Sequence, residues 1–175
     1  GASPTSATLQ DYLARCEARQ VLVDPVGGWR EATFTATDLV EADPAWLAGE
    51  VADRLGEAPE EGLDDDWVGR FDRAEDAHWS AVDDEDRLFE GAVLAAAVED
   101  APDPTTMFVS NSMPVRDADR FGRPRAADLT VLGNRGASGI DGITSTALGA
   151  GSATDDPLVL VTGDLAYYHD SNGLL

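Results

Sequence analysis

The sequence predicts an α/β fold in which helices flank a parallel sheet. Four short, mostly apolar segments are typical of buried strands; they are residues 20–23, 106–110, 129–132 and 158–162. Helix signals occur between them. Strands that are covered on both faces read as continuous apolar runs, and they occur mainly in parallel sheets with helices on each side. These two observations together favour an α/β architecture.

The first half of the chain contains one strand signal and one strong helix signal. The strand at 20–23 ends at Asp24-Pro25, a turn sequence. An extended stretch around 33–37 follows, and Pro44 behind an Asp43 cap predicts the start of a helix. Residues 56–66 are acidic, contain Pro and Gly, and lack periodicity. We expect an interdomain linker there, which divides the chain into residues 1–55 and 67–175.

The second half alternates helices with the three remaining strands. Residues 67–80 are expected to be helical, and Asp83 is expected to cap a longer helix. The apolar face of that helix is marked by Leu88, Ala92, Ala95 and Ala96. Between the last two strands, residues 139–150 are rich in Gly at their start and compatible with a helix afterwards.

The charge of the chain is extreme. Its 34 acidic residues face twelve Arg and no Lys, so the formal net charge is −22 at pH 7. The acids are spread along the chain, which favours a salt-adapted cytoplasmic protein over a disordered acidic tail. Counterions must screen such a surface. The same field repels phosphate, so nucleic acid and anionic membranes are not expected as partners.

Polar clusters follow three successive strands of the second half, at 111–116, 133–142 and 163–166. In parallel sheets, ligands bind beyond the carboxyl ends of the strands. Gly163-Asp164 lets the backbone approach a phosphate while the carboxylate reaches a divalent cation such as Mg²⁺. Each cluster alone is more often a turn, a surface Arg or a local backbone cap. Their occurrence at successive strand ends predicts an anion site, although the pattern does not name the ligand.

Five segments of the sequence resemble a known family. NRGASGIDG at 134–142 and GDLAYYHDSNGLL at 163–175 resemble the 2-succinyl-5-enolpyruvyl-6-hydroxy-3-cyclohexene-1-carboxylate synthases (the MenD family), which are thiamine-diphosphate enzymes. NSMPVRD at 111–117 is similar to the substrate-contacting loop of that family. VDPVGGW and FTATDLVEADP, within residues 23–44, look like the tail of its central domain. The resemblance implies that residues 1–55 end the central domain and that 67–175 begin the diphosphate-binding domain.

The resemblance also implies roles for individual residues. Thiamine diphosphate and Mg²⁺ would be the cofactors, with Asp164 as a metal ligand. Cofactor contacts would come from Gly139, Ile140, Gly163, Asp164, Leu165 and Ala166. Isochorismate would be contacted by Asn111, Ser112, Arg116 and Arg135. No residue of this chain is expected to act as the catalytic acid or base.

The implied reaction is decarboxylation of 2-oxoglutarate and addition of the succinyl unit to isochorismate, a step of menaquinone biosynthesis. The chain is expected to be an internal fragment that is inactive alone, from a parent that forms a homodimer or homotetramer. Two other interpretations remain open. One is another thiamine-diphosphate decarboxylase, similar to acetolactate synthase. The other is a non-catalytic module that binds an anion or a nucleotide.

Overall fold

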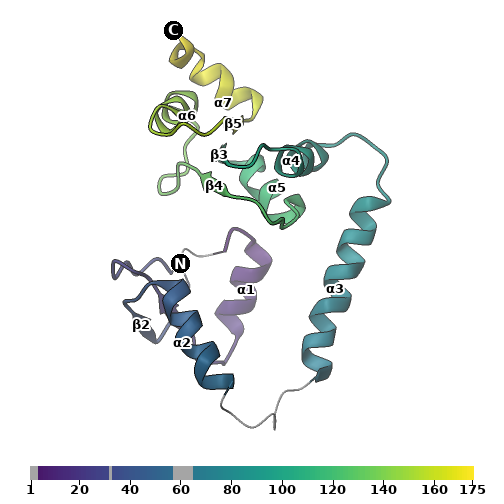
Figure 1. Cartoon of the computed structure of the whole chain (residues 1–175), viewed down its shortest axis with the longest axis vertical. Coiled ribbons are helices and arrows are strands. Elements are labelled where there is room, and N and C mark those ends of the chain that lie inside the picture. Colours follow the sequence, from purple (N-terminus) through teal and green to yellow (C-terminus); the bar gives the residue numbers. More distant parts are fainter. Residues whose placement is uncertain (1–3, 32, 57–64) are drawn as a thin grey trace. The chain divides into compact units, whose positions relative to one another are not determined.

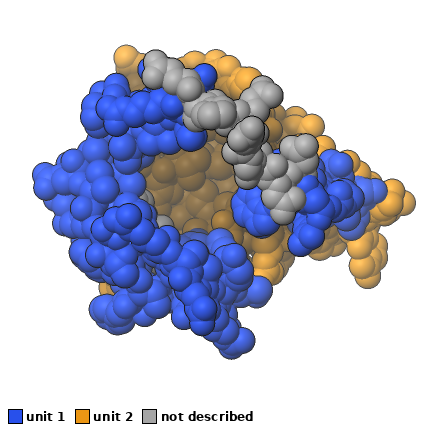
Figure 2. Space-filling view, turned by 90° about the horizontal axis from the view of Figure 1, so that it is seen from below, with its two compact units in different colours: residues 1–81 blue, residues 82–175 orange. Residues whose placement is uncertain are grey.

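The computed structural model describes residues 4–31, 33–56 and 65–175. They belong to two compact units, residues 1–81 and residues 82–175 (Figures 1 and 2). Helices alternate with parallel strands in the chain, which confirms the predicted α/β class. Most of the predicted linker, at 57–64, lies outside the described residues. No helix in the described part of the chain is both long enough and apolar enough to cross a membrane.

The first unit contains a two-stranded parallel sheet. Its elements are α1 (Ala7–Arg15), β1 (Val21–Val23), β2 (Asp38–Val40), α2 (Pro44–Gly56) and most of α3 (Asp65–Asp83). Val21 lies opposite Asp38 in the register of β1 and β2. The Asp43 carboxylate accepts a hydrogen bond from the backbone N–H of Trp46 at 2.8 Å. The predicted start of α2 is therefore confirmed.

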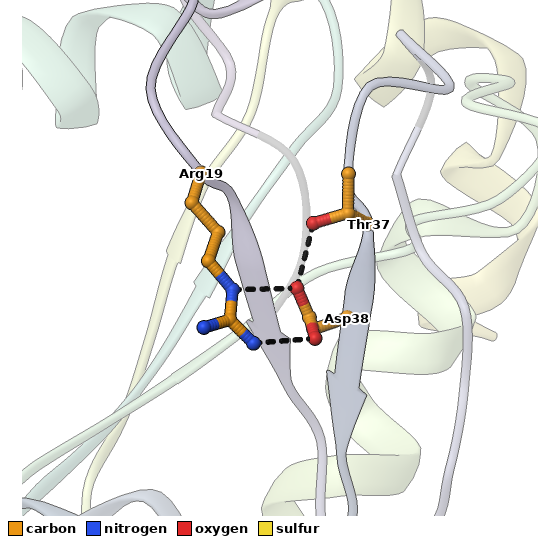
Figure 3. A network of polar contacts seen from close by, with 3 residues as sticks. All are labelled: Arg19, Thr37 and Asp38. Carbon is orange, nitrogen blue, oxygen red and sulfur yellow. Dashed lines mark hydrogen bonds and ion pairs between the residues drawn. The ribbon is translucent and has the colours of Figure 1, made fainter.

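An ion pair joins the segments that carry β1 and β2. The Arg19 guanidinium donates to both carboxylate oxygens of Asp38, at 2.9 and 2.7 Å (Figure 3). The Thr37 hydroxyl donates to the same carboxylate at 2.6 Å. These hydrogen bonds, led by those from Arg19, hold the pKa of Asp38 far below its usual range.

The second unit contains the larger sheet. Its elements are α4 (Glu90–Glu99), β3 (Thr105–Val109), α5 (Met113–Phe121), β4 (Leu129–Leu132), α6 (Ile143–Gly151), β5 (Leu158–Val161), α7 (Asp164–His169) and a 3₁₀ turn (Ser171–Leu174). The strand order is β4-β3-β5 and both pairings are parallel. Every residue of the central strand β3 is buried, as expected for a strand of a parallel sheet that is covered on both faces.

The alternating side chains of β3 build a core on each face of this sheet. Phe108 packs with Ile143, Ala147 and Ala166, which come from α6 and α7. Met107 and Val109 point to the other face, where α5 packs. This division follows from the two-residue period of a strand.

One helix boundary differs from the prediction. Asp83 ends α3 and does not cap the next helix, which begins only at Glu90. Leu88 lies before that helix and is 87% exposed, whereas Leu94 is buried. The buried face of α4 also differs from the predicted one: it contains Leu94 and Gly91, and Gly91 lies against the rings of Phe89 and Phe121.

Candidate functional site

The chain changes direction across the sheet between β3 and β5. From β3 it passes through α5 to β4, and from β4 it returns through α6 to β5, on the other side of β3. Consequently α5 covers the Met107 face, while α6 and α7 cover the Phe108 face (Figure 1). The connections that leave β3 and β5 therefore diverge, and ligand crevices of open α/β sheets form at such a point.

A cavity of about 530 Å³ lies at this point. Its walls contain seven of the residues that the sequence singled out, namely Asn111, Ser112, Ile140, Gly163, Asp164, Leu165 and Ala166. Apolar side chains from α4, α5 and β5 complete the lining, among them Leu94, Met113 and Val161. Such a volume and such a mixture of apolar walls with a few polar groups are typical of a small-molecule site.

Gly163 offers an open stretch of backbone to the cavity. Its φ of −76° and ψ of 158° are available to any residue, and a Cβ at this position would meet no atom within 4 Å. Nothing within the described residues therefore requires a glycine here. A bound group that approaches the backbone closely would require one, as diphosphates do at strand-to-helix turns.

Asp164 places a carboxylate beside this backbone. Its Oδ1 accepts a hydrogen bond from the Leu165 N–H at 2.8 Å, and the side chain is exposed at the start of α7. The described residues contain no group of three or more His, Cys, Asp or Glu side chains that would hold a metal by themselves. One carboxylate together with diphosphate oxygens and water is, however, a donor set that suits Mg²⁺. The residues present thus fit a magnesium-bound diphosphate.

Ser112 has an unusual backbone conformation at the start of α5. Its φ is 71° and its ψ −127°, and its hydroxyl makes no capping hydrogen bond. A non-glycine residue at positive φ is strained, and such strain is common at functional sites. Arg116, one turn later, donates from Nη1 to the Ser112 carbonyl. Ser112 lines the cavity together with Gly163.

Asn111 connects the end of β3 to the loop that follows β4. It is 2% exposed, and its Nδ2 donates to the carbonyls of Asn134 and Gly139, each at 2.7 Å. Its Oδ1 accepts from Arg135 Nη1 at 2.7 Å. Gly139, Arg116 and Arg135 do not line the cavity. Each of them is one hydrogen bond away from a residue that does.

Two acidic residues of the cavity wall were not predicted from the sequence. Glu90, at the start of α4, and Asp117, on α5, both line the cavity, and Asp117 is only 5% exposed. Both lie on helices that pack beside the sheet, so the pattern of polar residues at strand ends does not predict them. For Asp117 a signal was present, because it follows Met113 by four residues and therefore shares its helix face. For Glu90 the sequence offers no comparable signal.

Comparison with known proteins relates the whole chain to one group of enzymes. No family model matches the chain. It is 65% identical over 175 residues to the 2-succinyl-5-enolpyruvyl-6-hydroxy-3-cyclohexene-1-carboxylate synthase of Natronomonas pharaonis. The proteins of the same name from Haloarcula marismortui and Bacillus pumilus are 62% and 38% identical over 178 and 179 residues. Each match covers 100% of this chain but only 29% or 30% of the relative. The chain thus spans under a third of the length of these relatives.

Proposed function

We propose that this chain supplies part of the thiamine-diphosphate site of an enzyme. The reason is that it belongs along its whole length to the family of 2-succinyl-5-enolpyruvyl-6-hydroxy-3-cyclohexene-1-carboxylate synthases. The observation that carries this proposal is the cavity at the carboxyl edge of β3 and β5, in which Ile140, Gly163 and Asp164 come together. In this assignment residues 1–55 end the central domain and residues 67–175 begin the diphosphate-binding domain.

The residues of the cavity divide the work of holding the cofactor. Asp164 would ligate Mg²⁺, and the bare backbone at Gly163 would let the diphosphate approach the start of α7. Ile140 and Leu165 would supply apolar contacts, with Gly139 and Ala166 beside them. When bound, thiamine diphosphate supplies an electron sink for the decarboxylation of a 2-oxo acid. A chain of net charge −22 repels an anionic cofactor, and a bound Mg²⁺ would offset this repulsion at the site.

The substrates of this proposal are 2-oxoglutarate and isochorismate. Arg116 and Arg135 are both exposed, and each is hydrogen-bonded to a residue of the cavity wall. Planar guanidinium groups suit carboxylates through paired hydrogen bonds. The Ser112 hydroxyl would contact the same acceptor. Their contribution would be to orient an anionic acceptor relative to the donor. Menaquinone biosynthesis in a salt-adapted cytoplasm is the corresponding setting.

One observation favours a second candidate within the same enzyme class. Neither Arg116 nor Arg135 lines the cavity itself, whereas Ile140, Gly163 and Asp164 would serve any thiamine-diphosphate decarboxylase equally well. A decarboxylase with another acceptor, or without one, is therefore the alternative.

Both candidates are tested in a synthase of full family length that carries this chain as its corresponding segment. In molar KCl with thiamine diphosphate and Mg²⁺, release of carbon dioxide from 2-oxoglutarate is followed with and without isochorismate. We expect turnover that needs both substrates and that falls at least about 100-fold in Asp164→Ala. Asp155→Ala, which changes an exposed acid outside the cavity, is the control and should retain activity. Release without isochorismate would favour the decarboxylase, and no release would refute both.

A further inference from the structure

We infer that Asn111 is a positioning residue which clamps the loop between β4 and α6, and that it does not contact the substrate. This inference deepens the proposed function and rests on it, because the loop carries Arg135 and Ile140, the residues proposed to face acceptor and cofactor. The loop, residues 133–142, is called the β4–α6 loop below. The clamp consists of three hydrogen bonds made by one buried side chain.

The hydrogen bonds of Asn111 reach both ends of the exposed part of the loop. Nδ2 donates to the carbonyls of Asn134 and Gly139, and Oδ1 accepts from Arg135 Nη1, all at 2.7 Å. Asn134 and Gly139 lie five positions apart, so a single carboxamide closes the segment between them into a ring. Because only 2% of the Asn111 surface is exposed, water competes little with the carboxamide for these partners.

The partners of the carboxamide fix its orientation. A primary amide has two N–H donors and one carbonyl acceptor. Two backbone carbonyls face Nδ2 and one guanidinium faces Oδ1, so the reverse orientation would oppose like groups at all three contacts. Both donors of Asn111 are therefore engaged by the protein. The carboxamide has no N–H left for a substrate carboxylate, and donation to one would require breaking the clamp.

The β4–α6 loop needs such an external support. Gly136, Ser138 and Gly142 all have positive φ, of 137°, 57° and 65°. For Ser138, a residue with a Cβ, this conformation costs on the order of 1 kcal/mol. The segment 135–139 is also exposed, so burial of its own side chains contributes little to holding it. Hydrogen bonds from Asn111 at both ends offset this cost.

The clamp also restricts the Arg135 side chain. The hydrogen bond from Nη1 to Asn111 Oδ1 restrains one end of the guanidinium but leaves its other N–H groups for a carboxylate. Ordering a long Arg side chain costs about 2 kcal/mol of rotamer entropy. Asn111 orders part of the Arg135 side chain before the substrate binds. It should therefore lower the KM for an anionic acceptor, although Asn111 itself does not contact that acceptor.

The first test measures the loop and needs no activity. In the full-length synthase that carries this chain, hydrogen–deuterium exchange of residues 133–142 is compared without cofactor or substrate. Asn111→Ala and Asn111→Asp both remove the two N–H donors, and we expect exchange about tenfold faster in either variant. Ser110→Ala is the matched control, because Ser110 is equally buried and its hydroxyl has no partner within the described residues. Unchanged exchange in both Asn111 variants would overturn the clamp.

The second test separates positioning from a substrate contact. We expect Asn111→Ala to raise the KM for isochorismate about tenfold and to leave the KM for 2-oxoglutarate unchanged. In an Arg135→Ala background the same change should have little further effect, because Asn111 acts through Arg135. Additive effects would show a direct substrate contact and overturn the inference. If the wild type makes no product, the proposed function fails, and the exchange measurement still decides the clamp.

Discussion

The two units of the chain are held together by different means. Residues 82–175 bury eight apolar side chains, seven of them in two clusters on the two faces of β3. Among the described residues of 1–81, by contrast, only Asp24 is buried, and it is a carboxylate. Net charge does not explain this difference, because 1–81 has eighteen acids and six Arg while 82–175 has sixteen acids and six Arg. The comparison teaches that acidic residues play structural parts where apolar burial is scarce.

Three carboxylates act as cross-links in the first unit. Asp24 Oδ1 accepts from the N–H groups of Val26 and Gly28, at 3.0 and 2.9 Å, and so closes the turn after β1. Glu31 accepts from the Thr33 hydroxyl and from the backbone of the 33–36 segment, and Asp38 pairs with Arg19 (Figure 3). These hydrogen bonds lower the pKa of all three groups. In the second unit Asp103 and Asp170 also accept hydrogen bonds from distant segments, but the most deeply buried of these cross-links is the neutral carboxamide of Asn111.

The largest expected effect of this difference is on salt dependence. Transfer from 1 M to 0.1 M KCl lengthens electrostatic screening from about 3 Å to about 10 Å, and repulsion then acts on both units alike. We expect 1–81 to lose structure at a higher salt concentration because it has less buried apolar area to oppose that repulsion. All four Trp lie in this unit. Their fluorescence should therefore change before far-ultraviolet circular dichroism has fallen by half, whereas coincident transitions would contradict the comparison.

Truncation of a strand side chain sharpens the comparison. Met107 on β3 is 1% exposed, whereas Leu39 on β2 is half-buried. Met107→Ala should lower the free energy of unfolding by about 2–5 kcal/mol. Leu39→Ala should cost about 1 kcal/mol or less, since less of the side chain leaves water on folding. Urea titration in molar KCl measures both, and equal losses would show that the first unit has a core of the same quality.

A pair of glycines tests how tightly the second unit is packed. A Cβ on Gly91 would lie 2.3 Å from the Phe121 ring, whereas one on Gly149 would meet nothing within 4 Å. Gly91→Ala should therefore destabilise the unit by about 1–3 kcal/mol through overpacking of α4 against α5. Gly149→Ala, the control, should stabilise α6 by about 0.5–1 kcal/mol through helix propensity. Thermal unfolding followed by circular dichroism gives both values, and a tolerated Gly91→Ala would contradict close packing.

The smallest expected effect is on acid stability. A carboxylate whose pKa is lowered on folding stabilises the fold above its unfolded pKa, near 4, and loses that contribution as pH falls through the folded pKa. For Asp38 the cause is first the Arg19 guanidinium and then the Thr37 hydroxyl. Asp38→Asn should therefore make unfolding of the first unit, followed by Trp fluorescence between pH 5 and 2, less dependent on pH. The pair is exposed, so molar salt should weaken the effect.

Glu85 provides the control for that titration. Arg87 lowers the pKa of Glu85 to about 2, but this pair lies in the second unit, where apolar burial dominates. Glu85→Gln should leave the Trp signal of the first unit unchanged over the same pH range. A change as large as that of Asp38→Asn would mean that the titration reports the whole chain and not β1 and β2.

Four of the five strands and the strand-end polar groups could be predicted from the sequence because they depend on local pattern; β2 (Asp38–Val40) was missed, since an extended stretch was expected at 33–37. The run 129–132 corresponds to β4 without a shift, and 158–162 differs from β5 by one residue. Seven of the ten predicted site residues line one cavity because carboxyl ends of parallel strands share an edge. The role of Asn111 was not predictable, since its partners lie more than twenty residues away. Glu90 depends on how α4 packs beside the sheet, which no local pattern encodes, whereas Asp117 shares a helix face with Met113.

The most direct test of the central claim is equilibrium binding of thiamine diphosphate with Mg²⁺ to wild type and to Gly163→Ala, in the full-length synthase that carries this chain. A Cβ at Gly163 meets no protein atom within 4 Å, so the variant should fold and melt like wild type without cofactor. If the diphosphate lies against this backbone, affinity should fall at least about tenfold, which is about 1.4 kcal/mol. Equal affinity in the two proteins would contradict the proposal that the cavity beside β5 holds the cofactor.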